Sequence, residues 1–337
     1  MKKTRCLSGA LAASALLAFL LVPLAVRAAE SDMSLQTSSG TIQGTLSMPS
    51  STSGRVPVAL IIAGSGPTDR NGSNKLGVPV TPYKMLAAAL ATHGIASVRY
   101  DKRGIAASAK SAPLGNPPTF TSYVDDVVAW VKQLRADKRF SRVVLVGHSE
   151  GSLLALLAAG KVHVDGVVSL EGAGRPAMGV IIEQLKNSGA PQQVVDNVTR
   201  IGSAIRDGED PGTVPQELLP LFPPTLHTYE QQFFSADPVD AAKSLTVPFL
   251  VVQGGADIQV TLQDAHLLSD VNSGAVLRVF PNMTHVLLDA TGNDRAASLA
   301  TYTNTSLPID PAMTDAVAAF ILQKPVPGDS GPPPNPS

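Results

Sequence analysis

The sequence predicts an α/β fold, with a mostly parallel sheet, helices on both faces and an inserted helical cap. Short apolar runs, such as VPVALIIA at 56–63 and VVLV at 143–146, alternate with segments whose apolar residues recur at helical spacing. Because these runs are apolar throughout, both faces of the strands should be covered, as in parallel sheets. The alternation stops between Gly174 and Leu245, and this interruption predicts the cap.

The expected elements can be given in chain order. A hairpin is expected at 37–50, strands at 56–63, 95–100, 143–146, 164–170, 248–253 and 275–280, and helices at 83–92, 123–138, 152–159 and 310–324. The interrupting stretch, about 175–244, holds helical patterns, an acidic loop and an apolar cluster. It therefore favours a cap inserted into one domain rather than a separate domain.

The two ends of the chain differ in composition from the rest. A basic start precedes an apolar run, and Val26-Arg27-Ala28 offers small residues for cleavage. This pattern predicts a signal peptide at 1–28 and an exported protein, periplasmic or secreted, with an uncleaved membrane anchor as the alternative. The domain would span 29–323, and the Pro-rich tail at 324–337 is expected to be disordered.

Charge and cysteine content exclude several classes of function. Of the 337 residues, 44% are hydrophobic and 16% charged, which suits a large buried core. Without residues 1–28 the chain has 22 basic and 27 acidic residues, so its net charge is −5. This balance favours neither nucleic acid nor stable membrane association after leader cleavage. The one cysteine, Cys6, lies in the leader, and no histidine pair has metal-ligand spacing, so neither metal nor cofactor is expected.

The stretch GHSEG, from Gly147 to Gly151, fits the G-x-S-x-G pattern of a nucleophile elbow. An apolar strand precedes it and an apolar helix follows it, as that sharp turn requires. The two glycines leave room for the chains to cross, because a side chain there would collide with the neighbouring backbone. We therefore expect Ser149 to be a catalytic nucleophile, with an ordinary loop serine as the alternative.

A serine nucleophile needs a base, and the base needs an acid that orients it. Asp257 and His285 each follow a predicted strand, so both should meet Ser149 at the same edge of the sheet. They are the expected acid and base, although Asp257 also fits a plain turn residue. His148 lies too close to Ser149 to act as the base. The remaining histidines, His93, His163, His227 and His266, suit surface or core positions.

Acyl transfer also needs N–H groups directed at the developing oxyanion. We expect one from the backbone of Glu150, the residue after the nucleophile, and one from Ser65 in the loop AGSGPTDRNG. The Glu150 carboxylate itself has two interpretations. It is either turned aside from the site, or it repels anionic substrates and contributes to selectivity.

These segments together resemble the α/β-hydrolase superfamily, in particular bacterial exported esterases related to its serine-aminopeptidase-like branch. The similar segments are IAGSGPTDRNG, SVRYDKRGIAAS, VVLVGHSEG, FLVVQGGADIQV and NMTHVLL. The resemblance implies Ser149 as nucleophile, Asp257 as acid, His285 as base and an oxyanion contribution from 64–66. The sequence departs from the family pattern in two places. Ala63-Gly64 stands where a His-Gly pair is common, and RGIAAS at 103–108 lacks the glycines that usually follow its Arg-Gly.

The expected activity is hydrolysis of small carboxylic esters with short to medium acyl chains. It should fall below about pH 6–7, because the base must be neutral. Apolar cap residues would line an acyl pocket or merely pack the cap: Leu218, Leu219, Leu221, Phe222, Phe233 and Phe234. One alternative is an exported aminopeptidase whose cap carboxylates, Glu183, Asp207, Glu209 and Asp210, hold an ammonium. Another is a non-catalytic binding protein on a hydrolase scaffold. No pattern in the sequence indicates an oligomeric state.

Overall fold

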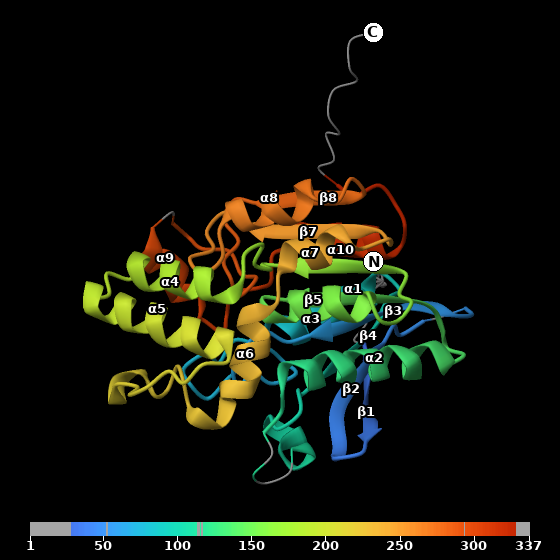
Figure 1. Cartoon of the computed structure of the whole chain (residues 1–337). Coiled ribbons are helices and arrows are strands. Elements are labelled where there is room, and N and C mark those ends of the chain that lie inside the picture. Colours follow the sequence, from blue (N-terminus) through green and yellow to red (C-terminus); the bar gives the residue numbers. More distant parts are fainter. Residues whose placement is uncertain (1–27, 52, 113–114, 116, 293, 328–337) are drawn as a thin grey trace, which may run out of the picture.

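The computed structural model describes residues 28–51, 53–112, 115, 117–292 and 294–327. The predicted signal peptide therefore lies outside the described residues, except for its last position. Figure 1 shows one sheet running from β1 and β2 at the bottom of the view to β8 at the top, with helices on both sides. This arrangement confirms the predicted fold class.

The sheet has eight strands in the order β1-β2-β4-β3-β5-β6-β7-β8. Pairing is antiparallel between β1 and β2 and between β2 and β4, and parallel from there on. The hairpin begins earlier than predicted, because the polar residues of β1 pair along the whole of β2. The strands are β1 (Ala29–Thr37), β2 (Gly40–Met48), β3 (Val56–Ile62), β4 (Ala96–Tyr100), β5 (Phe140–His148), β6 (Gly166–Leu170), β7 (Phe249–Gly254) and β8 (Ala275–Phe280).

Two apolar clusters cover the two faces of the sheet. In β3, Val58 and Leu60 belong to one cluster, whereas Ala59 and Ile61 belong to the other, as the alternation along a strand requires. The first face packs against α2 (Phe120–Ala136), α3 (Glu150–Ala159), α7 (Pro238–Lys243) and α8 (Leu262–Asp270). The second face packs against α1 (Pro82–Thr92) and α10 (Pro311–Ile321). The short elements η1 (Ala106–Ser111) and α9 (Arg295–Thr301) lie in connecting segments.

The cap lies between β6 and β7 and has an apolar cluster of its own, which includes Val198, Ile201 and Phe222. Its helices α4, α5 and α6 gather on one side of the sheet, at the left of Figure 1. The expected range of 175–244 extends too far at its end, because Ala241 and Ala242 of α7 pack in the core of the sheet. The elements of the cap are α4 (Ala177–Asn187), α5 (Gln192–Asp207), η2 (Gln216–Leu218), η3 (Pro224–Leu226) and α6 (His227–Ser235).

The start of the C-terminal tail is packed, which corrects the predicted boundary at residue 324. Val326 is 8% exposed and joins the apolar cluster around α10. The guanidinium of Arg278 donates hydrogen bonds to the carbonyl groups of Val326 and Pro327. The rest of the tail, 328–337, lies outside the described residues. Within the part of the chain that is described, no helix is both long and apolar enough to span a membrane.

Candidate active site

Ser149 lies at a strained turn between β5 and α3. Its φ of 53° and ψ of −121° fall in a region that side chains rarely adopt. A Cβ atom on Gly147 would lie 2.1 Å from the carbonyl oxygen of Gly151, and one on Gly151 would lie 2.2 Å from that of Ile62. The two glycines of GHSEG therefore meet the steric demand that the sequence predicts.

The side chains of His285 and Asp257 form a hydrogen-bonded pair. Each follows a strand of the sheet, and His285 Nδ1 lies 2.8 Å from Asp257 Oδ2. The N–H groups of Gln259 and Val260 donate to Asp257 Oδ1. Burial alone would raise the pKa of Asp257, but the charge and hydrogen bond of His285 lower it below its usual value. The carboxylate thus accepts from Nδ1–H, which leaves Nε2 of His285 free to accept a proton.

Ser149 and His285 line the same small cavity of about 180 Å³, together with Gly64 and Ser65. The structure therefore brings the three predicted triad residues to one site. Among the described residues, Ser149 Oγ makes no hydrogen bond to His285, and such bonds commonly form only once substrate is bound.

The loop of Gly64 and Ser65 lies against Ser149. A Cβ atom on Gly64 would lie 3.2 Å from that of Ser149, so the backbone comes close to the serine. Both polar groups of Gly64 are held: its N–H donates to Tyr83 Oη at 3.1 Å, and its carbonyl accepts from Lys102 Nζ at 2.7 Å. Ser65 is exposed and lines both cavities that meet at Ser149.

Lys102 forms an ion pair with Glu150 that the sequence interpretation missed. Lys102 Nζ lies 2.7 Å from Glu150 Oε1, and the two side chains are 2% and 1% exposed. The hydroxyl of Tyr229 in the cap donates to Glu150 Oε2. The negative charge of the carboxylate is thereby compensated inside the protein, which argues against the interpretation that it repels anionic substrates. Through Nζ, this ion pair joins the elbow to the loop of Gly64.

His148 links the same loop to the backbone of His285. Its Nε2 lies 2.7 Å from the carbonyl oxygen of His285, and its Nδ1 lies 2.8 Å from Tyr83 Oη. Since a carbonyl only accepts, Nε2 carries the proton and Nδ1 accepts from the tyrosine. Burial, together with the nearby His285, lowers the pKa of His148 to about 3. His148 is thus a neutral structural link, consistent with its exclusion as the base.

Glu171, at the end of β6, is a second buried carboxyl that the sequence interpretation missed. Its oxygens accept from the N–H of Gly254 and from Nε2 of Gln253. Burial, and then the charge of Asp257, raise the pKa of Glu171 well above its usual range. We therefore expect Glu171 to keep its proton beside Asp257 and to be the donor in the hydrogen bond between the two carboxyl groups. No short sequence pattern marks this position.

The side chains of Glu171, Asp257 and His285 offer ligand-type atoms within 4.8 Å of one another. In the described part of the chain they are the set that could hold a metal ion. However, Nδ1 of His285 carries the proton that it donates to Asp257, and Glu171 is protonated as well. This donor set fits a hydrogen-bonded network better than a cation site, because metal ligands must be deprotonated.

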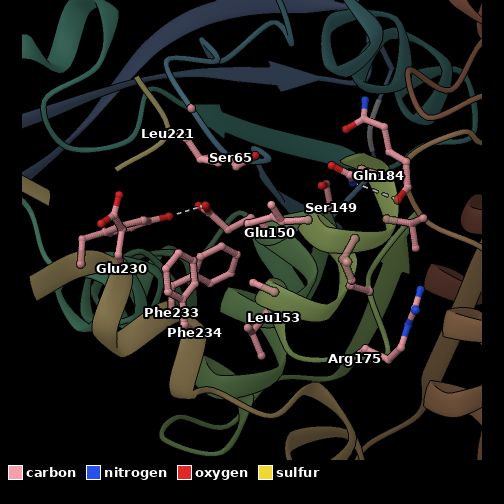
Figure 2. A pocket seen from close by; sticks show the side chains of 18 of the residues that line it. Ser65, Ser149, Glu150, Leu153, Arg175, Gln184, Leu221, Glu230, Phe233 and Phe234 are labelled. Atoms are coloured by element: carbon pink, nitrogen blue, oxygen red, sulfur yellow. Dashed lines mark hydrogen bonds between the residues drawn. The ribbon is translucent and has the colours of Figure 1, made fainter. Parts of the chain in front are cut away.

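A larger cavity of about 380 Å³ extends from Ser149 under the cap. Figure 2 shows Ser65, Ser149 and Glu150 beside the side chains of Leu153, Phe233 and Phe234. The apolar cap residues named from the sequence have different environments. Leu221, Phe233 and Phe234 line the cavity, whereas Leu218 and Phe222 are buried in the core of the cap. Leu219 is 38% exposed and does not line the cavity. The cavity is lined mainly by apolar residues: Leu153, Val180, Ile181, Leu221, Leu226, Phe233, Phe234 and Val260.

The cap carboxylates named for the aminopeptidase alternative do not line this cavity. Glu183 pairs with Arg175, and Asp207 pairs with Arg206 at the surface. Glu209 and Asp210 are exposed. The cap glutamate that does line the cavity is Glu230, which the sequence interpretation passed over.

The strand order, the strained serine after β5 and the hydrogen-bonded Asp257–His285 pair after β7 and β8 define an α/β-hydrolase fold. Comparison with known proteins specifies the family. Residues 79–291 match the family described as serine aminopeptidase, S33, and the chain belongs to it. The resemblance found in the sequence is thereby confirmed.

Several known proteins are similar to the chain. It is 30% identical over 262 residues to esterase EstD of Thermotoga maritima, an alignment covering 74% of this chain and 59% of that protein. The chain thus spans about three fifths of that relative's length. Est1E of Butyrivibrio proteoclasticus, solved with ferulic acid, shares the fold with a TM-score of 0.57 and 18% identity over 87% of this chain and 98% of its own. An acylaminoacyl peptidase of Pyrococcus horikoshii has a TM-score of 0.56 and 14% identity over 91% of this chain and 43% of its own.

Proposed function

We propose that the chain is a serine hydrolase that cleaves carboxylic esters with short to medium acyl chains. One observation carries the proposal: Ser149, on its strained turn, shares a cavity with His285, whose Nδ1 is already bonded to Asp257. Similarity to a protein named as an esterase supports the same activity. The apolar lining of the larger cavity supports an acyl group as its occupant, since its volume is within the usual range for small-molecule sites.

The proposed mechanism assigns one role to each of these residues. Nε2 of His285 takes the proton of Ser149 as Oγ attacks the ester carbonyl, while Asp257 holds the imidazole in the required tautomer. The backbone N–H groups of Ser65 and Glu150 stabilise the oxyanion of the tetrahedral intermediate. His285 then protonates the leaving alcohol from the smaller cavity, and water attacks the acyl-enzyme by the same route.

Kinetics on a chain-length series of nitrophenyl acyl esters test this proposal. Ser149→Ala and His285→Ala should each lower kcat by roughly four orders of magnitude or more, because the two side chains act as one unit. Ser65→Ala is the matched control, since only its backbone N–H is used and turnover should be retained. Ordinary esterase activity of Ser149→Ala would refute the proposal. Faster hydrolysis of aminoacyl anilides than of esters would favour the aminopeptidase alternative.

We also propose that residues 1–28 direct export and are removed. The support is the basic start, the apolar run and the small residues before Ala29. Fractionation of the producing cells, with N-terminal sequencing of the exported protein, should give a chain that begins at Ala29. A cytoplasmic protein that keeps its first residues would contradict export.

A further inference from the structure

We propose that Glu230 forms a polar subsite of the acyl cavity and binds a hydroxyl group carried by the acyl chain of the substrate. This inference rests on the proposed ester hydrolysis and specifies its substrate class. Glu230 lies on α6 and lines the cavity that contains Ser149. In the view of Figure 2 it lies on the far side of Glu150 from Ser149, which places it away from the ester carbonyl.

One oxygen of the Glu230 carboxyl group, Oε2, is buried without a hydrogen-bond partner in the part of the chain that the structure describes. The residue is 5% exposed, and its Oε2 has no hydrogen bond to any described residue. The other glutamates near the cavity are occupied, because Glu150 pairs with Lys102 and Glu183 pairs with Arg175. A buried polar atom without a partner destabilises the fold, so a group that is kept in this state beside a substrate cavity points to a ligand.

A hydroxyl fits this carboxyl better than an ammonium does. Burial raises the pKa of Glu230 to about 7, so both protonation states are populated near neutral pH. A hydroxyl both donates and accepts, and therefore satisfies the ionised and the neutral carboxyl alike. An ammonium would lose its hydration in a largely apolar cavity that Arg175 also lines. Only the Glu230 carboxylate could compensate its charge, because Glu150 is already paired with Lys102.

The surrounding residues favour an extended acyl group that ends in this hydroxyl. Phe233 and Phe234 follow Glu230 on α6 and line the same cavity, as does Leu221 from the preceding loop. Apolar contacts would hold the methylene chain between Ser149 and the carboxyl, and the terminal hydroxyl would supply the missing hydrogen bond. The cavity would then distinguish hydroxylated from plain acyl chains, because only the former satisfy the buried polar group.

The test compares plain nitrophenyl acyl esters with the matched series that carries a terminal hydroxyl, using the full chain and its Glu230→Leu and Glu230→Gln variants. At the best chain length, wild type should favour the hydroxylated ester in kcat/KM, and Glu230→Leu should lower that preference about tenfold, mainly through KM. Glu230→Gln should keep most of it, because an amide still accepts a hydrogen bond. The control is Gln231→Leu, on the same helix but outside the cavity lining, which should leave the ratio unchanged.

Thermal unfolding gives a second readout that does not depend on substrate. Glu230→Leu should raise Tm, because it removes an unpartnered buried carboxyl, and a fall in Tm would show a structural partner and overturn the inference. If Glu230→Leu is active and its kcat/KM preference for the hydroxylated ester equals that of wild type, the subsite is refuted while the proposed ester hydrolysis stands. A preference for terminal ammonium over hydroxyl would replace it with a cation site. If wild type hydrolyses no ester of either series, the proposed function fails and the subsite falls with it.

Discussion

Two buried glutamates beside the site, Glu150 and Glu171, remove their carboxyl groups from water in different ways. Glu150 follows Ser149 directly and pairs with the ammonium of Lys102. Glu171 lies beside Asp257 and has only neutral donors around it, from Gln253 and Gly254. Both residues are at most 5% exposed, so the difference lies in their partners and not in their burial.

The comparison shows that a buried carboxyl needs either a cation or a proton. A cation suits Glu150, because Lys102 Nζ also holds the carbonyl of Gly64 and so fixes both sides of the proposed oxyanion site. A proton suits Glu171, because a second charge beside Asp257 would be repelled, whereas a protonated carboxyl donates to it. The ion pair organises the serine side of the site, and the neutral network organises the histidine side.

The largest expected effect comes from removing the cation. Lys102→Met leaves the Glu150 carboxylate buried and unpaired, which should lower the free energy of unfolding by about 3–5 kcal/mol. The double variant Lys102→Met/Glu150→Gln should recover most of this loss, because neither charge is then present. Urea unfolding of the three proteins measures both effects. If the single and double variants had equal free energies of unfolding, the ion pair between Lys102 and Glu150 would not stabilise the fold as expected.

The sequence was sufficient to predict the architecture. Apolar runs such as 56–63 and 143–146 alternate with helical patterns, and this periodicity is local, so every predicted strand and helix of the sheet core is present. Boundaries were less well predicted, since they depend on partners elsewhere. The tail residue Val326 packs only because α10 offers an apolar surface, and α7 belongs to the sheet because Ala241 and Ala242 reach its core.

The convergence of the candidate site residues could be predicted from the sequence, because the expected chemistry imposes a pattern. Ser149, Asp257 and His285 follow strands of one parallel sheet, so their convergence follows from topology. The supporting network could not be predicted, because its members meet only in three dimensions: Lys102 lies 48 positions from Glu150, and Glu171 lies 83 positions from Gly254.

A second prediction concerns His148, whose imidazole stays neutral in the folded chain. The pKa of His148 is about 3 in the folded chain, against 6.5 for an ordinary histidine, so between these values the unfolded chain binds more protons. Stability should therefore fall as the pH drops from 6.5 toward 3, by up to about 1.4 kcal/mol per pH unit from this group. His148→Gln should remove this contribution in urea unfolding over the same range. An identical slope in the variant would contradict a buried neutral His148.

A smaller loss of stability is expected from removing the neutral hydrogen bonds of Tyr83 at the loop of Gly64, which Lys102 also holds. Tyr83→Phe removes the acceptor of the Gly64 N–H and the donor to His148, while the ion pair remains. The expected cost is about 1–3 kcal/mol of stability, with a fall in kcat larger than any change in KM, since the loop loses one of its two anchors. Ester kinetics and urea unfolding check the two parts. A variant that changes KM alone would show that the tyrosine contacts substrate and does not anchor the loop.

The smallest effect should come from Glu171→Gln, and it separates the two glutamates most sharply. A protonated carboxyl and an amide both donate to Asp257, so stability should change by no more than about 1 kcal/mol and turnover should persist. Glu150→Gln, the same substitution, leaves Lys102 unpaired and should cost several times more. In the folded chain Glu171 is expected to keep its proton, whereas in the unfolded chain it loses the proton above pH 4.5. Its contribution to stability therefore falls as the pH rises. The free energy of unfolding of Glu171→Gln, measured in urea relative to wild type, should therefore increase as the pH rises. A decrease would show that Glu171 is ionised in the fold.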